Sequence, residues 1–221
     1  MQTLTEQLLE EGLNDRVLTD LQLARLIWGS SQRRYNLVNR AMRAGELIRL
    51  RRGLYMLSDK YRSQPCHPYV LAQKLLPGSY VSLETALAFH GWIPEAVYTT
   101  ASVGPGRQTK EYICEPLGRF TFHPLAIESG YFLELVERVQ LGEQAVLIAQ
   151  PIRALLDLIC LKKMDWQGLA WFVEGMRIDE ETLRRVSGAE LRTLKQVYKH
   201  KRVKGFIAEL EIALGLELGH D

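Results

Sequence analysis

Polar side chains between residues 31 and 43 have the chemistry to contact nucleic acid bases. The set that recurs at helical intervals consists of Gln32, Arg33, Asn36, Asn39, Arg40 and Arg43. Steps of three and four residues place such side chains on one face of a helix. Arginine can donate two hydrogen bonds to guanine, and an amide can pair in the same way with adenine. The spacing therefore predicts a helix face that reads base edges.

A second group of arginines follows in the segment LIRLRRGLYML, residues 47–57. The segment alternates as a strand does, so Ile48 and Leu50 are expected on one side and Arg49 and Arg51 on the other. Arg52-Gly53 predicts the turn of a hairpin. Arginines on such a hairpin suit the phosphate backbone or the minor groove, where they add affinity with little sequence choice.

The elements that position these side chains have clear start and stop signals. Leu4, Leu8 and Leu9 predict a first helix that ends at Gly12. Thr19 and Gln22 have capping-box spacing, which predicts a second helix from about residue 19 to residue 28.

The third helix is expected after the turn Gly29-Ser30-Ser31, and it should run to Ala44 and stop at Gly45. Tyr35, Leu37, Val38, Ala41 and Met42 are expected to fill its apolar side. Helix, turn and helix followed by a hairpin predict a winged helix-turn-helix.

Charge is concentrated in the same part of the chain. Residues 25–52 hold eight arginines and one acid, Glu46. Residues 16–62 carry eleven basic and three acidic side chains, whereas the rest of the 221 residues carries 17 basic and 23 acidic ones. A basic segment on an acidic remainder favours binding to a polyanion.

Together these patterns predict binding to double-stranded DNA, because a helix fits the wide major groove of B-DNA but not the narrow one of A-form RNA. The alternative for each single arginine is a solvated surface position. The expected DNA-binding residues are Ser31, Gln32, Arg33, Arg34, Asn36, Arg40, Arg43, Arg49, Arg51 and Arg52.

The remainder of the chain predicts a second, larger domain. Residues 58–68 are polar, contain two prolines and lack periodicity, which indicates a boundary. We expect a DNA-binding domain over 1–60, a linker over 61–68 and a mixed α/β domain over 69–221 with a helical C-terminal third. The fold class is α+β. The β segments of the larger domain are expected at 80–81, 97–103, 110–114, 120–123 and 145–148.

The helices of the C-terminal third follow from apolar periodicity after Pro151, which suits a first helical position. Beyond that helix, further helices are expected at 166–175, 180–186, 189–200 and 203–214.

Composition excludes several classes. Cys66, Cys114 and Cys160 are widely separated, so neither a disulfide framework nor a zinc cluster is expected. No stretch reaches the roughly 18 apolar residues of a membrane span. The first 13 residues are acidic where a signal peptide is basic, so a cytoplasmic protein is expected.

No catalytic residue, metal site or cofactor is predicted. The carboxylates Glu84, Glu95, Asp157, Asp165 and Asp179 are scattered singly, without metal-ligand spacing. Asp157 lies on an apolar helix and is expected to be a structural acid that pairs with Arg153 one turn earlier. The basic run KHKRVK at 199–204 is either a set of phosphate contacts or a solvated junction between helices.

Three segments in order resemble the AbiEi family of antitoxins. They are LIRLRRGLYML, YVSLETALAFHGWIPEA at 80–96 and PIRALLDLI at 151–159, within a resemblance that covers roughly residues 15 to 160. The chain departs from the family near Pro151, because Ile152 and Arg153 stand where the family often has Glu and Lys.

The resemblance implies a type IV toxin–antitoxin protein of the abortive-infection, phage-defence kind. Its winged helix would bind inverted repeats in its own promoter and repress transcription, with the DNA-reading part corresponding to residues 31–44 and the hairpin around 51–53. The larger domain would counteract a nucleotidyltransferase-like toxin without the need for a stable complex.

Two other classes remain open from the residues alone. A ligand-sensing repressor without a toxin partner predicts a sizeable closed pocket in the larger domain. A nuclease or nucleotidyltransferase with a DNA-targeting domain predicts clustered carboxylates, which the sequence does not offer.

Overall fold

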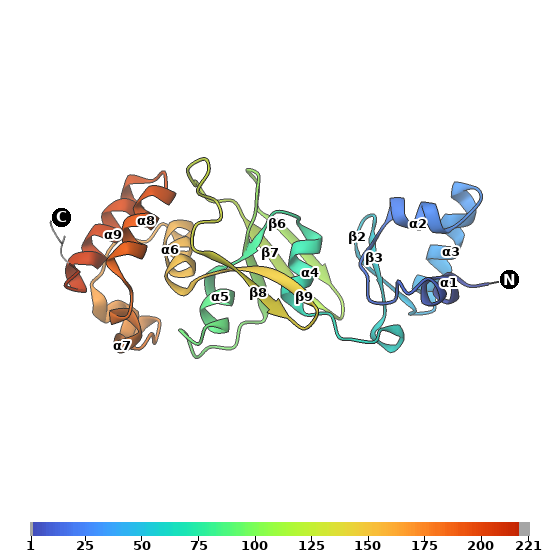
Figure 1. The fold of residues 1–221 in the computed structure, drawn as a ribbon, viewed down its shortest axis with the longest axis horizontal. Coiled ribbons are helices and arrows are strands. Elements are labelled where there is room, and N and C mark those ends of the chain that lie inside the picture. The colour runs from blue at the N-terminus through green and yellow to red at the C-terminus, as the bar shows by residue number, and fades with distance from the viewer. Residues whose placement is uncertain (1, 217–221) are drawn as a thin grey trace. The chain divides into compact units, whose positions relative to one another are not determined.

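The computed structural model describes residues 2–216 and has a mixed α+β fold with two separate β-sheets (Figure 1). The predicted α+β class is confirmed at this level. Within the described chain, contacts group residues 2–77 and 112–119 into unit 1, and residues 78–111 and 120–216 into unit 2. The expected domain limits at 60 and 69 stay a prediction.

Unit 1 contains four helices, a short 3₁₀ helix and a small antiparallel sheet among its described residues. Its helices are α1 (Leu4–Glu10), α2 (Asp20–Leu26), α3 (Ser31–Arg43) and α4 (Pro68–Leu75), with the 3₁₀ helix at Asp59–Tyr61. Its strands are β1 (Leu18–Thr19), β2 (Leu47–Arg51) and β3 (Leu54–Leu57).

Local capping explains where α2 begins. Gln22 donates its main-chain N–H to the Thr19 hydroxyl over 3.3 Å, and the Thr19 main-chain N–H donates to Gln22 Oε1 over 2.8 Å. This reciprocal arrangement satisfies amides that have no partner within the helix, and it confirms the predicted capping box. The helix ends at Leu26, two residues before the expected limit.

The core of unit 1 joins the first three helices to the sheet. Helices α1 and α2 have seven residues each and bury little apolar area by themselves, so they gain stability mainly from this shared core. The strand order is β1-β3-β2, and β1 is a strand that the sequence did not predict. The buried cluster consists of Leu4, Leu8, Leu18, Leu23, Ile27, Leu37, Val38, Ala41, Leu47, Tyr55 and Leu57.

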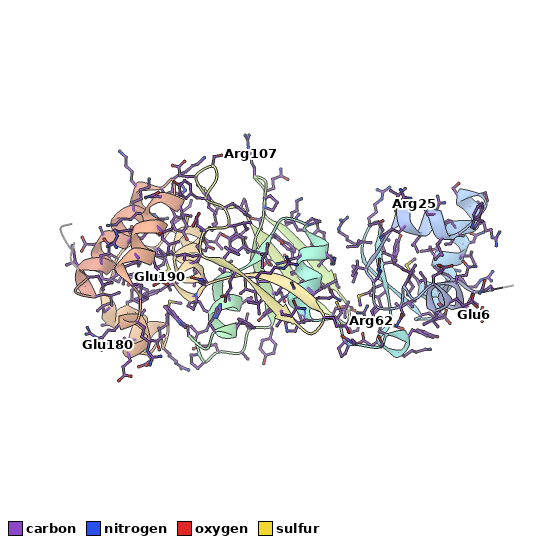
Figure 2. The ribbon with its side chains drawn as sticks, in the orientation of Figure 1. Glu6, Arg25, Arg62, Arg107, Glu180 and Glu190 are labelled. Atoms are coloured by element: carbon purple, nitrogen blue, oxygen red, sulfur yellow. The ribbon has the colours of Figure 1, made fainter. Side chains whose placement is uncertain are left out.

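The segment expected as a linker is held by hydrogen bonds within unit 1. Asp15 Oδ1 accepts from the main-chain N–H of Ser63 over 3.0 Å and of Gln64 over 3.3 Å. A hydrogen bond from the Ser63 hydroxyl, together with these amides and Arg62, lowers the pKa of Asp15 despite the opposing effect of burial. Arg62 is the residue that follows the 3₁₀ helix (Figure 2).

Unit 2 is built on a six-stranded mixed sheet. Its strand order is β6-β7-β5-β4-β9-β8, and β4 pairs in parallel with β9 at Val81 and Ile148. The strands are β4 (Tyr80–Val81), β5 (Thr99–Val103), β6 (Lys110–Cys114), β7 (Gly118–His123), β8 (Val136–Leu141) and β9 (Gln144–Ala149), with residues 112–119 of β6 and β7 grouped in unit 1.

Helices complete unit 2, and α6 lies between the sheet and the pair α8 and α9 (Figure 1). The predicted helix over 166–175 is wrong in its start, because helical turns begin at residue 169 and continue as a π-helix at Trp171–Gly175. The α-helices are α5 (Leu83–Phe89), α6 (Pro151–Lys162), α7 (Glu180–Arg184), α8 (Gly188–Val197) and α9 (Lys201–Ala213).

Candidate nucleic-acid interface

Helix α3 begins after the predicted turn and ends one residue before its predicted limit at Ala44. Ser30 is the N-cap, and its hydroxyl accepts from the Arg33 main-chain N–H over 3.2 Å. The helix ends before Ala44, and Gly45 takes a φ of +67°, a left-handed conformation that glycine adopts without a Cβ clash. Leu37, Val38 and Ala41 are buried and face the core of unit 1. The rotation of the helix is therefore set by these three side chains.

That rotation leaves most of the predicted base-reading side chains in solvent. Exposed positions on α3 are Ser31, Gln32, Arg33, Tyr35, Asn36, Arg40 and Arg43, while Arg34 and Asn39 are half-buried. The prediction that Tyr35 fills the apolar side is wrong, because its side chain is 63% exposed. At about 100° per residue, Tyr35 lies about 200° around the helix from Leu37.

A hollow of about 590 Å³ opens between α3 and the β2–β3 hairpin. Five of the predicted DNA-binding residues line it, and these are Ser31, Gln32, Arg34, Arg49 and Arg52. The other lining residues are Asp20, Tyr35, Val38, Asn39, Met42 and Tyr55. Three arginines and two amides thus share one concave surface within unit 1.

The other predicted residues lie outside this hollow. Arg33 lines a separate hollow of about 240 Å³ together with Glu10, Glu11 and Trp28. Asn36, Arg40 and Arg43 are exposed on α3 but are not among the lining residues of either hollow. The side chains of the predicted base-reading face therefore do not share one surface: Gln32 and Asn39 line the hollow beside the hairpin, and Arg33 lines the other hollow.

A β-bulge changes the hairpin from the expected alternation. Arg49 pairs with Tyr55 and Arg51 with Leu54, so Leu50 is an extra residue in β2. The expected sidedness of the strand is wrong, because Leu47 and Leu50 are buried whereas Ile48 is half-buried. The bulge separates Arg49, which is exposed, from Arg51, which is half-buried.

The guanidinium of Arg51 already has partners within unit 1. Its Nε donates to the main-chain oxygen of Leu75 over 3.2 Å, and its Nη1 donates to the oxygen of Arg52 over 3.3 Å. Arg25, by comparison, is an exposed arginine on α2 (Figure 2). Contact between Arg51 and DNA stays a prediction, and it would have to use the remaining N–H groups.

Asp20 is a residue of the hollow that sequence analysis did not single out. Its main-chain N–H donates to the Gly53 oxygen over 3.1 Å, which joins α2 to the turn of the hairpin. Burial raises the pKa of Tyr55, and the Asp20 carboxylate raises it further. Gly53 has a φ of +75°, and a Cβ there would lie 2.9 Å from Asp20 Oδ2. The turn therefore requires glycine for both conformation and space.

Asp157, the acid of helix α6, belongs to a buried polar cluster in unit 2. Arg153 Nε lies 3.0 Å from Asp157 Oδ1, and both side chains have 0% exposure. This confirms the pairing that the i, i+4 spacing predicted. Tyr198 donates to Asp157 Oδ1 over 2.7 Å, and Tyr80 and Ser82 donate to Oδ2 over 3.0 and 2.8 Å.

Each nitrogen of the Arg153 guanidinium also has a hydrogen-bond partner. Its Nη2 donates to the Tyr80 hydroxyl over 2.7 Å, and its Nη1 donates to the Glu134 oxygen over 2.9 Å. Burial opposes the charge on Arg153, but Asp157 and the two tyrosines outweigh it and raise the pKa. Burial, followed by Asp157, raises the pKa of both Tyr80 and Tyr198. A cluster so completely paired is suited to holding structure.

This cluster also joins two of the segments that carry the family resemblance. Tyr80 and Ser82 come from residues 80–96, and Arg153 and Asp157 come from residues 151–159. The His90 Nε2 atom lies 3.0 Å from the Ala149 oxygen, which is a further link between the same regions. The four motif residues of the cluster are therefore interior to unit 2, whereas His90 is half-buried.

One side chain of the basic run at 199–204, Arg202, makes hydrogen bonds within unit 2. Arg202 Nη1 donates to the Met164 oxygen over 2.7 Å, and Nη2 donates to the Cys160 oxygen over 3.4 Å. These contacts satisfy main-chain oxygens at and just beyond the C-terminal end of α6. Lys199 and Lys201 are exposed, so the DNA-contact hypothesis for this run now concerns the lysines.

Burial also shifts the pKa of two histidines and one cysteine in the described chain. Burial lowers the pKa of His67 and of His123. Burial, followed by Asp157, raises the pKa of Cys160 to about 11. Within residues 2–216 no three His, Cys, Asp or Glu side chains gather as metal ligands would. Over the same range no helix is long and apolar enough to cross a membrane.

No protein-family model matches the chain, and no curated protein matches it.

Proposed function

We propose that unit 1 is a winged helix-turn-helix module that binds double-stranded DNA with sequence preference. The observation that carries the proposal is the hollow between α3 and the hairpin, which Arg34 of α3 and Arg49 and Arg52 of the hairpin line together with the amides Gln32 and Asn39. A helix with its side chains is about 10–12 Å across, and the major groove of B-DNA is about 12 Å wide. In this proposal α3 enters the groove and the hairpin lies along the adjacent backbone.

The arginines of the hollow would hold phosphates. Each phosphate that a protein neutralises adds about 0.9 to the slope of log K against log salt concentration. Arg49 and Arg52 lie on the hairpin side of the hollow, so we assign them to the backbone. Gln32 and Asn39 lie on the helix side and have the donors and acceptors that base edges require.

The direct test measures binding to a duplex from the chain's own upstream promoter by fluorescence anisotropy at several salt concentrations. We expect preference over a scrambled duplex, and we expect the double variant Arg49→Gln, Arg52→Gln to lower the salt slope by about 1.8. Arg107→Gln is the matched control, because Arg107 is an exposed arginine of unit 2 (Figure 2). Equal binding of promoter and scrambled duplex by the unaltered protein would refute sequence-selective binding.

We further propose that the protein represses its own operon and acts as the antitoxin of a type IV pair. The resemblance of residues 15–160 to AbiEi antitoxins supports this role, in which unit 2 counteracts a nucleotidyltransferase-like toxin. A ligand-sensing role for unit 2 is the alternative proposal, and the hollow around His90 and Ile152 holds about 230 Å³. Small-molecule sites usually occupy roughly 300–1,000 Å³.

Coexpression separates the two roles. The gene beside this one is expected to encode a nucleotidyltransferase-like protein that stops growth, and coexpression of this chain should restore growth. The Arg49→Gln, Arg52→Gln variant should lose repression of a promoter reporter and still restore growth, because the substituted residues lie in unit 1. Failure of the unaltered chain to restore growth would reject the antitoxin role and leave DNA binding to its own test.

A further inference from the structure

Two amide side chains on the exposed face of α3 are joined by a hydrogen bond. Gln32 Nε2 donates to Asn36 Oδ1 over 3.1 Å, one helical turn apart, and both residues are exposed. Side chains four residues apart on a helix are neighbours, so this bond forms without distortion of the backbone. The structure thus orients a Gln amide that would otherwise rotate freely in solvent.

The bond leaves Gln32 with a defined pair of free groups. Its Oε1 can still accept, and its second Nε2 hydrogen can still donate. In the major groove adenine presents a donor at N6 beside an acceptor at N7, which complements this pair. Guanine presents acceptors at both O6 and N7, so one of them would face Gln32 Oε1 and be repelled.

The position of Gln32 on α3 suits contact with a base. It is the second residue of the helix, and it lines the hollow between α3 and the hairpin. It lies about 220° around the helix from the buried Leu37, on the side away from the core. The N-terminal residues of a helix in the major groove contact base edges.

We propose that Gln32 reads an adenine in the operator, and that Asn36 is a positioning residue that holds the Gln32 amide. The proposal rests on the proposed function, since it requires α3 to lie in a major groove. A bidentate amide–adenine pair corresponds to a preference of about 5- to 150-fold over the wrong base. Asn36 contributes to this preference because its Oδ1 accepts from Gln32 Nε2 and so prevents the Gln32 amide from flipping, which would exchange its donor and acceptor.

The test is selection from a pool of randomised DNA duplexes, with base preference and total affinity measured at each position. The unaltered protein should prefer adenine at one position of each half-site, and Gln32→Ala should abolish the preference there alone. Asn36→Ala should lower it at least about 5-fold at the same position. Asn36→Asp keeps an acceptor for Gln32, so it should retain the adenine preference while the added negative charge weakens binding to all sequences.

Asn39→Ala is the matched control, because Asn39 is an amide of the same helix that also lines the hollow. It should leave the preference at the Gln32 position unchanged. Circular dichroism should show that all variants fold, since the substituted residues are exposed or half-buried polar positions.

The outcomes distinguish failure of the Gln32 proposal from failure of the proposed DNA binding. If the unaltered protein selects no sequence, both the DNA-reading function and the inference fail. If it selects a sequence but Gln32→Ala or Asn36→Ala leaves every base preference intact, only the inference fails. Preference for guanine at the Gln32 position, or loss of preference in Asn36→Asp as complete as in Asn36→Ala, would also overturn it.

Discussion

Replacement of Asp157 by asparagine removes one charge from the interior of unit 2 and leaves the side-chain volume nearly unchanged. In the native cluster Asp157 pairs with Arg153 at 3.0 Å, and neither side chain has any exposure. The variant leaves the Arg153 guanidinium buried without a counter-charge. It also replaces one carboxylate oxygen by an amide nitrogen that can only donate, and each of the two oxygens accepts two hydrogen bonds in the native cluster.

The expected loss of stability follows from that burial. Removal of one partner from a buried ion pair costs about 3–5 kcal/mol, because the remaining charge cannot be solvated. Whole domains are stable by only about 5–15 kcal/mol, so the loss is a large part of the total. In proteins of this size about 1 kcal/mol corresponds to about 2–4 °C, so the melting temperature should fall by roughly 6–20 °C.

Urea unfolding followed by tryptophan fluorescence measures the effect, because Trp92, Trp166 and Trp171 all lie in unit 2. Asp165→Asn is the matched control: it makes the same chemical change at an exposed residue and should alter stability by less than about 0.5 kcal/mol. A loss below about 1 kcal/mol in Asp157→Asn, with the control unchanged, would refute the argument that this pair is desolvated and mutually dependent.

Two further predictions concern alkaline stability and the hairpin turn. Burial raises the pKa of Tyr80 and Tyr198 above 10, so the unfolded chain loses these protons first. The stabilising contribution of these protonated tyrosines is therefore fully present below about pH 10. Above that pH the free energy of unfolding should fall by about 1.4 kcal/mol per pH unit for each tyrosine. Urea titrations between about pH 9 and pH 11.5 measure this, and a constant free energy of unfolding would contradict it. Gly53→Ala should cost about 1–2 kcal/mol from its left-handed φ alone. The clash between the new Cβ and Asp20 adds to this cost. Gly12→Ala is the control, because Gly12 has a similar φ and open space around it. Thermal melts should show a larger fall in melting temperature for Gly53→Ala than for Gly12→Ala, and equal falls would exclude the clash.

The local signals in the sequence predicted most helices of unit 1 and the hairpin. The Thr19 capping box, the Ser30 N-cap and the glycine at residue 45 act within a few residues, so no distant contact is needed to recognise them. The winged-helix assignment built on them remains a proposal.

Strand β8 was missed because its sequence carries little strand pattern. Its apolar residues Val136, Val139 and Leu141 do not alternate regularly, because two charged residues separate the first from the second and a single glutamine separates the second from the third. The strand exists because it pairs with the next strand, β9, across the short turn at residues 142–143, and the hydrophobic spacing within β8 alone does not encode that pairing. The bulge at Leu50 was missed for a related reason, since it depends on the register against β3.

The residue types available for a nucleic-acid interface were determined by the sequence itself, because arginine and amide chemistry and helical spacing are local properties. Which of them share one surface was decided by the tertiary structure. Packing of Leu37, Val38 and Ala41 sets the rotation of α3, so Gln32 and Arg34 face the hollow whereas Arg33 lies on the opposite flank. Helix rotation follows from contacts between segments distant in the chain, and periodicity alone cannot supply it.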